Sequence, residues 1–287
     1  MLFRRLVFTT MLAVVFLVAG CGARPEPTPT AIPTRTPKPI PTVVVPPGRL
    51  GITFVDNDCF LLISDDKKIL IDPHKQIVSR AIWTAIQKAQ PPFDGVDLIL
   101  VTHNHPDHFD YDLVGAQLLA NPDAVLATTR QVANALKSYF PDYGKVQDRV
   151  KAFAPAEGER VSATLNGIEI EALFLSHDDP VFNLGFIIRF GGKKLLHTGD
   201  TQTPFLPIYD FPKDNLDIAF VQYYWLASSD FVTNGRRLSL DAIQAKQYVP
   251  MHHSAATPYL SSLFEQIAAN IPNSIRLRDS METYLVE

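Results

Sequence analysis

The pattern of apolar and polar positions predicts an α/β domain over residues 48–287. Short runs of β-branched and other apolar residues predict strands, because such side chains pack well on a pleated surface. Segments with apolar residues three or four positions apart predict amphipathic helices. In the first part, the predicted strands are 52–55, 59–63, 68–71, 96–101 and 124–127, and the predicted helices are 79–89, 111–120 and 131–139.

The second part of the domain begins again with strands. Gly191-Gly192 between two apolar runs is a hairpin signal, because glycine readily adopts the positive φ angles of a tight turn. Two successive halves of strands and helices predict two sheets packed together with helices outside them. The predicted strands of this part are 150–153, 160–165, 168–175, 184–190, 193–197 and 216–221, and the predicted helices are 238–248 and 258–269.

The first twenty residues have the pattern of a secretory signal peptide. Arg4 and Arg5 form a positive start, and residues 6–19 are almost entirely apolar. That run of 14 residues is too short to span a bilayer comfortably as a helix. A positive start, a short apolar run and small residues at its end are typical of a cleaved signal, predicted here as residues 1–20.

The end of this segment, Val18-Ala19-Gly20-Cys21, resembles the bacterial lipoprotein signal. In that family of signals the cysteine becomes the first mature residue and carries lipid. Buried acyl chains contribute roughly 0.8 kcal/mol per methylene, so several chains on Cys21 would anchor the protein stably. The resemblance implies attachment to the bacterial cell membrane at its extracytoplasmic face. The alternative is an ordinary signal peptide with a chance cysteine.

Residues 21–47 are predicted to form a linker. Nine prolines and five threonines lie between residues 24 and 47. Such a segment cannot bury apolar surface and favours extended polyproline conformations. A semi-rigid stalk and a disordered tether are both consistent with this composition.

The net charge and the cysteine content limit the partners and the cross-links that the protein can have. Loss of the predicted signal removes two arginines and no acid, which changes the formal charge from −4 to −6. No basic stripe is present, which argues against nucleic acid as a partner. Cys59 is the only cysteine after Cys21 and lies in an apolar run, which favours a buried structural thiol. No oligomeric state is predicted.

Three of the eight histidines lie in residues 102–108, Thr-His-Asn-His-Pro-Asp-His, directly after a predicted buried strand. The proline after His105 favours extended backbone, in which residues two apart point the same way. His103 and His105 can therefore reach one cation, while Asp107 and His108 can face a second. Imidazole and carboxylate together suit zinc and similar divalent ions. The alternative reading is a polar loop.

The motif His-x-His-x-Asp-His after a buried strand resembles the signature of the metallo-β-lactamase superfamily. The remaining parts of that signature follow in order: His177 after a strand, Asp200 in a Gly-Asp pair, and His252 near the C-terminus. The resemblance covers essentially all of residues 48–287. It implies the fold of that superfamily, a four-layer αββα sandwich of class α/β.

The resemblance also implies two metal positions. Asp200 occupies the place of a bridging carboxylate, and a thiol there would suit many true β-lactamases, so Asp200 weighs against antibiotic hydrolysis. His105 stands where the di-iron redox branch has glutamate, which argues against that branch. The implied ligands are His103, His105 and His177 for one ion, Asp107, His108 and His252 for the other, and Asp200 for both.

The implied activity is hydrolysis by a hydroxide that two divalent ions activate near neutral pH. It would attack a carbonyl carbon or a phosphorus, with Asp107 as a catalytic group that orients the water. The ligands favour two zinc ions, and manganese and iron share them. Ester, lactone and phosphodiester bonds are all open, as are small-molecule and lipid-like substrates. The alternative function is a non-catalytic metal- or ligand-binding surface lipoprotein.

Several other polar residues have less specific readings. His197 is predicted to be packed rather than a ligand, and His74 to lie on a surface loop. The Pro-x-His pattern before His252 resembles the ascorbate-6-phosphate lactonase-like branch and favours His252 over His253; a phospholipase-D-like branch is also similar. Asp72 is predicted either to orient a ligand histidine or to be a turn residue.

Loops after Val221 and around Asn234 are expected to overhang the metals. Aromatic and arginine side chains there would suit a substrate with an apolar part and an anionic group. Surface packing is an equal alternative for Tyr223 and Trp225. The residues concerned are Gln222, Tyr223, Tyr224, Trp225, Arg236 and Arg237.

Overall fold

The computed structural model describes residues 40–77, 79–177, 180–201, 203–227 and 236–287. The predicted signal, Cys21, most of the predicted linker and Asn234 lie outside these residues. Within them, no helix has both the length and the apolar character needed to cross a membrane.

The last part of the predicted linker, residues 40–47, is described and contacts the domain. Ile40, Val43 and Val45 are partly buried and pack against a core cluster. Their apolar side chains therefore contribute to the folded part of the chain, although they precede the predicted boundary at Gly48.

The first half of the domain builds one sheet and three helices. Its strands are β1 (Leu50–Asp56), β2 (Cys59–Ser64), β3 (Lys67–Ile71), β4 (Leu98–Leu100), β5 (Val125–Thr129) and β6 (Val150–Phe153), joined by β13 (Thr283–Val286) from the C-terminus. The helices are α1 (Arg80–Gln87), α2 (Tyr111–Ala120) and α3 (Arg130–Tyr139), followed by 3-10 turns η1 (Tyr143–Lys145) and η2 (Gln147–Arg149). The strand order is β13-β1-β2-β3-β4-β5-β6, and β3 to β6 run parallel.

The second half builds the other sheet. Its strands are β7 (Arg160–Leu165), β8 (Ile168–Phe174), β9 (Leu184–Phe190), β10 (Lys193–His197), β11 (Ile218–Gln222) and β12 (Gln247–Met251). The helical segments are η3 (Thr203–Tyr209), η4 (Phe211–Asp214), α4 (Tyr223–Ala227), α5 (Arg236–Ile243) and α6 (Leu260–Asn270). The order is β12-β11-β10-β9-β8-β7, with β10, β11 and β12 parallel.

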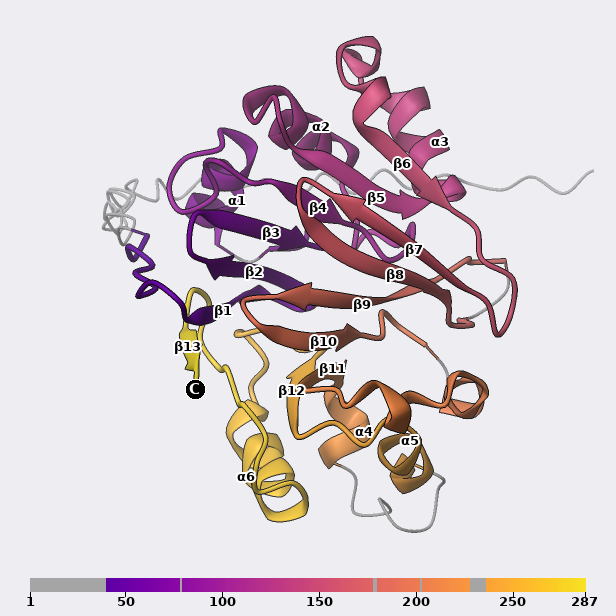
Figure 1. Ribbon diagram of the computed structural model, residues 1–287. Coiled ribbons are helices and arrows are strands. Elements are labelled where there is room, and N and C mark those ends of the chain that lie inside the picture. Colours follow the sequence, from indigo (N-terminus) through magenta and orange to yellow (C-terminus); the bar gives the residue numbers. More distant parts are fainter. Residues whose placement is uncertain (1–39, 78, 178–179, 202, 228–235) are drawn as a thin grey trace, which may run out of the picture. The chain divides into compact units, whose positions relative to one another are not determined.

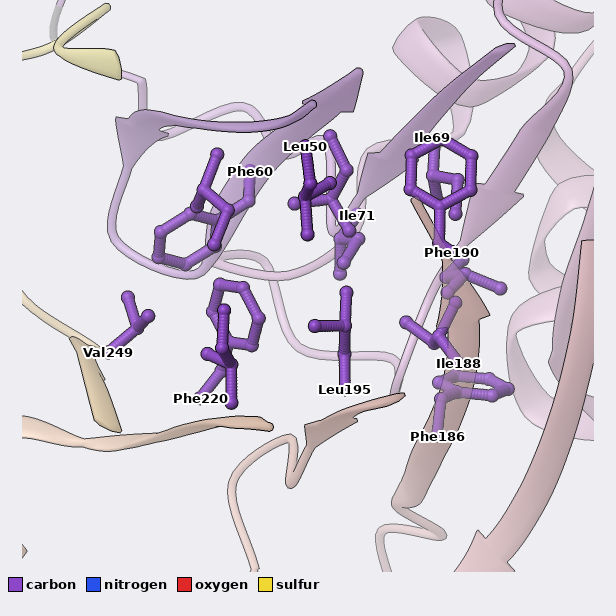
Figure 2. Packing of buried hydrophobic residues seen from close by; sticks show 14 of the residues in the cluster. Leu50, Phe60, Ile69, Ile71, Phe186, Ile188, Phe190, Leu195, Phe220 and Val249 are labelled. Atoms are coloured by element: carbon purple, nitrogen blue, oxygen red, sulfur yellow. The ribbon is translucent and has the colours of Figure 1, made fainter. Parts of the chain in front are cut away.

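Three apolar layers hold the described domain together. The central layer lies between the two sheets, where Phe60 and Ile71 point toward Phe220 and Leu195 (Figure 2). The Phe60 and Phe220 rings lie 4.9 Å apart and edge to face. A second layer joins the first sheet to α1–α3, and a third joins the second sheet to α4–α6 (Figure 1). The predicted α/β sandwich of four layers is confirmed.

Local sequence signals account for several element ends. Asp110 and Thr129 cap α2 and α3 by accepting hydrogen bonds from the backbone N–H groups of Leu113 and Val132. Gly191 and Gly192 have φ angles of 57° and 70° in the turn between β9 and β10, so the predicted hairpin is confirmed.

The predicted helix 238–248 is wrong at its C-terminal end. The helix ends at Ile243, and Gln247–Met251 forms β12, which pairs in parallel with β11. Pairing with a neighbouring strand outweighs the local helical spacing there. Pro250 is tolerated because β12 lies at the edge of its sheet. The sequence reading also missed α4 and β13, both of them short.

Candidate metal centre

The candidate residues follow strand ends of both sheets. His103, His105 and His108 lie on the loop after β4, and His177 lies on the loop after β8. Asp200 and His252 follow β10 and β12, two strands of the parallel part of the second sheet. The backbone N–H of Leu184 donates to the carbonyl of Thr102 and so ties the two sheets together beside this loop.

One cluster consists of three histidines. His103, His105 and His177 each place a ring nitrogen within 4.8 Å of the others. Nδ1 of His105 and Nε2 of His177 are 3.3 Å apart, and the rings meet nearly edge to face. Burial is the main reason that the pKa of His103 is well below its ordinary value. A neutral imidazole offers a lone pair, so this cluster has the chemistry of a divalent metal site.

A second cluster combines two histidines with two carboxylates. Asp58, His108, Asp200 and His252 also place one ligand atom each within 4.8 Å of the others. Burial alone would lower the pKa of His252, but Asp58 and Asp200 raise it to about 9. The second cluster contains two carboxylates and the first contains none, so the second cluster carries more negative charge.

The Asp200 carboxylate lies between the two clusters. Its Oδ2 is 2.8 Å from Nε2 of His252, 3.4 Å from Nε2 of His108 and 4.0 Å from Nε2 of His177. Burial opposes ionisation of Asp200, but the neighbouring imidazoles outweigh burial and lower the pKa of this carboxyl. A carboxylate in this position can offer oxygens to both clusters.

Asp72, at the end of β3, orients two of the histidines. It accepts hydrogen bonds from the backbone N–H and the hydroxyl of Thr102, both at 2.7 Å. Nδ1 of His108 lies 2.8 Å from the same carboxylate, and Nδ1 of His103 lies 3.0 Å from the Thr102 hydroxyl. Because that hydroxyl donates to Asp72, it accepts from His103. Each imidazole therefore holds its proton on Nδ1 and turns Nε2 toward the clusters.

Several buried polar atoms of the described residues support a fit to cations. Nε2 of His103, Nε2 of His108, Oδ1 of Asp200 and both carboxylate oxygens of Asp58 have no hydrogen-bond partner. Buried polar groups are normally satisfied, and an unpaired buried carboxylate is costly. Nitrogen and oxygen lone pairs that converge in this way are what a divalent ion requires, so the residues present fit metal ions.

Asp107 lies at the open edge of the centre. Its Oδ2 is 3.7 Å from Nε2 of His252, it belongs to neither cluster, and its side chain is 27% exposed. The backbone carbonyl of Asp107 accepts a hydrogen bond from the Asn57 side chain. The ligand and catalytic roles of Asp107 stay predictions.

Asp58 is the site residue that the sequence reading missed. It lies in the turn between β1 and β2, and its side chain is fully buried. An acid directly before the apolar run that begins at Cys59 gives no specific signal in the sequence, because its burial without a hydrogen-bond partner is known only from the structure.

The remaining histidines are buried outside both clusters. Nε2 of His253 donates a hydrogen bond to the Leu277 carbonyl, and the ring stacks on Phe54. His197 is packed beside Phe220, as predicted. The prediction for His74 is wrong: the residue is fully buried, because its ring nitrogens contact the backbone of Asp56 and Gln76. The Cys59 thiol is buried, as predicted.

The segment after β11 places one aromatic ring beside the centre. Tyr224 of α4 is 37% exposed, and its ring centroid lies 6.2 Å from that of His252. Trp225 is buried in the core, so it has a packing role rather than a substrate contact. Gln222 is buried and donates to the Gly199 carbonyl. The side chains of the predicted contact residues Arg236 and Arg237 lie outside the described residues.

Residues 67–253 match the model of a beta-lactamase superfamily domain. The chain belongs to this superfamily. A UPF0173 metal-dependent hydrolase of Pelotomaculum thermopropionicum is 26% identical over 254 residues, which cover 83% of this chain and 96% of that protein. A UPF0173 protein of Pyrococcus furiosus is 26% identical over 204 residues, covering 71% of this chain and 83% of that protein.

Solved structures agree on the metallo-β-lactamase fold. Igni18, described as a novel metallo hydrolase of Ignicoccus hospitalis, superposes with a TM-score of 0.61 at 18% identity and covers 83% of this chain and 99% of its own. At this identity the similarity shows the fold alone. Together with the named relatives, it confirms the prediction of a metal-dependent hydrolase at the level of the superfamily.

The two adjacent histidines near the C-terminus are expected to differ in metal binding. His252→Ala should lose about one equivalent of metal, because His252 Nε2 points at Asp200. His253→Ala should keep the wild-type metal content, because His253 belongs to neither cluster and its ring pairs with the Leu277 carbonyl and Phe54. Metal analysis of the two purified full-length variants decides this. Loss of metal from His253→Ala alone would show that the assignment is off by one residue.

Proposed function

We propose that this protein is a binuclear metal-dependent hydrolase that acts on an ester, lactone or phosphodiester bond. The observation that supports it best is the position of Asp200. Its carboxylate lies within 4.0 Å of histidines from both clusters. A bridging carboxylate can hold two ions roughly 3.5–4 Å apart, which is the spacing of two-metal hydrolytic sites.

Different residues of the chain would bind the metal ions and orient the attacking water in such a site. His103, His105 and His177 would hold one ion, and His108 and His252 the other, with Asp200 shared. When bound, the ions would supply an activated water and stabilise the negative charge that develops on the substrate. Asp107 faces the open side, where its carboxylate would orient the attacking water.

Exposure of the centre favours catalysis over a purely structural or storage role. His103 and His108 are fully buried, whereas the side chains of His252 and Asp107 are 30% and 27% exposed. A structural metal site is normally closed, while a catalytic site keeps an accessible position. The non-catalytic binding lipoprotein is therefore the weaker alternative.

The substrate class follows from what borders the open side. The exposed Tyr224 ring lies beside His252 and offers an apolar face with a hydroxyl at its rim. We propose a substrate in which an apolar group adjoins the hydrolysed bond, either a small molecule or a lipid-like compound.

A panel of substrates tests the function. Aryl esters, simple lactones and bis(p-nitrophenyl) phosphate would be offered to the full-length protein before and after removal of metal with a chelator. Hydrolysis of one class, lost on chelation and regained with zinc or manganese, is expected. Two bound metals without hydrolysis of any class would favour the binding-protein alternative.

We also propose that the protein is anchored by lipid at the extracytoplasmic face of the bacterial cell membrane. The lipoprotein-like segment Val18-Ala19-Gly20-Cys21 and the proline-rich segment after it support this. Cys21→Ser should release the protein from the membrane fraction or leave it unprocessed, because the acylated sulfur is lost. Fractionation with lipid labelling is the measurement, and unchanged labelling of the variant would rule the anchor out.

A further inference from the structure

The turn between β1 and β2 brings a carboxylate into the candidate metal centre that the superfamily signature in the sequence does not include. We propose that Asp58 is a direct ligand of the ion held by His108 and His252, and that it makes this position favour manganese over zinc relative to the three-histidine position. This inference rests on the binuclear site of the proposed function.

The backbone of the turn is tied to both loops that form the second cluster. The backbone N–H of His252 donates to the carbonyl of Asn57, and the Asn57 side chain donates to the carbonyl of Asp107. Asn57 and His252 both have positive φ angles, of 53° and 63°. The turn is thus fixed against the metal loops, and Asp58 is held at the second cluster rather than lying near it by chance.

No hydrogen bond among the described residues accounts for the burial of the Asp58 side chain. It is fully buried, and neither of its oxygens has a hydrogen-bond partner among the described residues. A carboxylate in such a place is retained at a cost unless a cation neutralises it.

The contact of Asp58 with His108 also has the geometry of a shared ion. Oδ2 of Asp58 is 3.4 Å from Nε2 of His108, whereas Asp72 occupies the opposite ring nitrogen, Nδ1. Asp72, and not Asp58, therefore orients the His108 ring. Once Nε2 binds a cation it has no proton to donate, so Asp58 faces the same cation as a second ligand. Ligand atoms at about 2.0–2.2 Å from one ion lie at most about 4.4 Å apart, close to the spread of this cluster.

The two positions would then differ in donor chemistry. Three imidazoles and one oxygen of Asp200 suit zinc. Two imidazoles with oxygens from Asp58 and Asp200 form a harder, more negative set, and carboxylate-rich sets suit manganese. Removal of Asp58 would leave two imidazoles and one carboxylate, a less oxygen-rich set, so manganese binding should lose more than zinc binding.

The test compares Asp58→Asn with the wild type, both as the full-length protein freed of metal. Manganese binding would be followed by the electron paramagnetic resonance signal of free Mn²⁺, and zinc binding by competition with a coloured chelator. Asp58→Asn should weaken manganese binding at one of two positions by at least about tenfold, because loss of a direct ligand should cost no less than loss of a group that supports one. Zinc binding at the three-histidine position should be unchanged, which also shows that the variant is folded.

Asp56→Asn is the matched control. Asp56 is a buried acid on the same hairpin, two residues away, and belongs to neither cluster. It should keep wild-type affinity at both positions. Asp58→Ser serves as a second variant and should reproduce the loss even if the amide disturbs the turn.

The outcomes separate this proposal from the proposed function. Two metals bound by Asp58→Asn and Asp58→Ser with wild-type manganese affinity would overturn the role of Asp58 and leave the binuclear hydrolase intact. An equal loss in Asp56→Asn would also overturn it, since general disturbance of the hairpin would then explain the effect. A wild-type chain that binds only one ion would contradict both.

Discussion

Replacement of Asp200 by alanine is expected to reduce hydrolysis at least about a hundredfold, the scale on which one electrostatic group aimed at a reaction centre acts. The Asp200 carboxylate lies within 4.0 Å of histidines from both clusters. Its loss would leave two positions without a shared ligand. Metal content should fall as well, because the negative charge that holds both ions together is removed. The measurement is metal content and turnover with the substrate class that the panel identifies.

Asp200→Asn should weaken metal binding while the fold persists, since a neutral amide is a poorer bridge between two cations. Circular dichroism would check the fold. Asp210→Asn is a suitable control, because Asp210 is half exposed and asparagine tolerates its left-handed backbone. An Asp200→Ala protein with two metals and full turnover would contradict the bridging role.

Replacement of Asp72 by alanine is expected to lower the free energy of unfolding by about 3–5 kcal/mol, the usual cost of removing one partner of a buried charged pair. Three donors would be left unpaired: the backbone N–H and hydroxyl of Thr102 and Nδ1 of His108. Alanine also fits poorly at a φ of 44°. Denaturant titration of the metal-free protein measures the loss.

The same variant should bind metal about 10–100-fold more weakly. His108 loses its hydrogen bond to Asp72, and the Thr102 hydroxyl that pairs with His103 loses the acceptor that orients it. Asp72→Asn keeps one acceptor and tolerates the backbone angle, so its effects should be smaller on both measurements. A loss below about 1 kcal/mol in the free energy of unfolding of Asp72→Ala would mean that this buried network contributes little to the stability of the fold.

Periodicity in the sequence predicted most of the elements correctly, because buried strands and amphipathic helices leave patterns that local reading detects. It was wrong where a long-range partner decides the structure. Residues 247–251 form a strand only because β11 lies beside them, and β13 forms only because β1 accepts it. Neither pairing is visible in a local window.

The candidate site was predicted in the same uneven way. Three histidines and an aspartate within residues 102–108 indicated a metal site from the local sequence alone. His177, Asp200 and His252 followed from the order of a known signature. Asp58 was not predicted, because a single acid in a turn becomes informative only when the fold places it in the core beside His108. The burial of His74 likewise depends on backbone partners that composition does not reveal.

The most direct test of a binuclear hydrolase is reconstitution of the metal-free, full-length protein with counted equivalents of zinc or manganese. Activity on the identified substrate class would be measured after each addition, with metal content determined in parallel. We expect negligible turnover without metal, little with one equivalent, and a maximum at two. Full turnover with no metal, or a maximum already reached at one equivalent, would contradict this expectation.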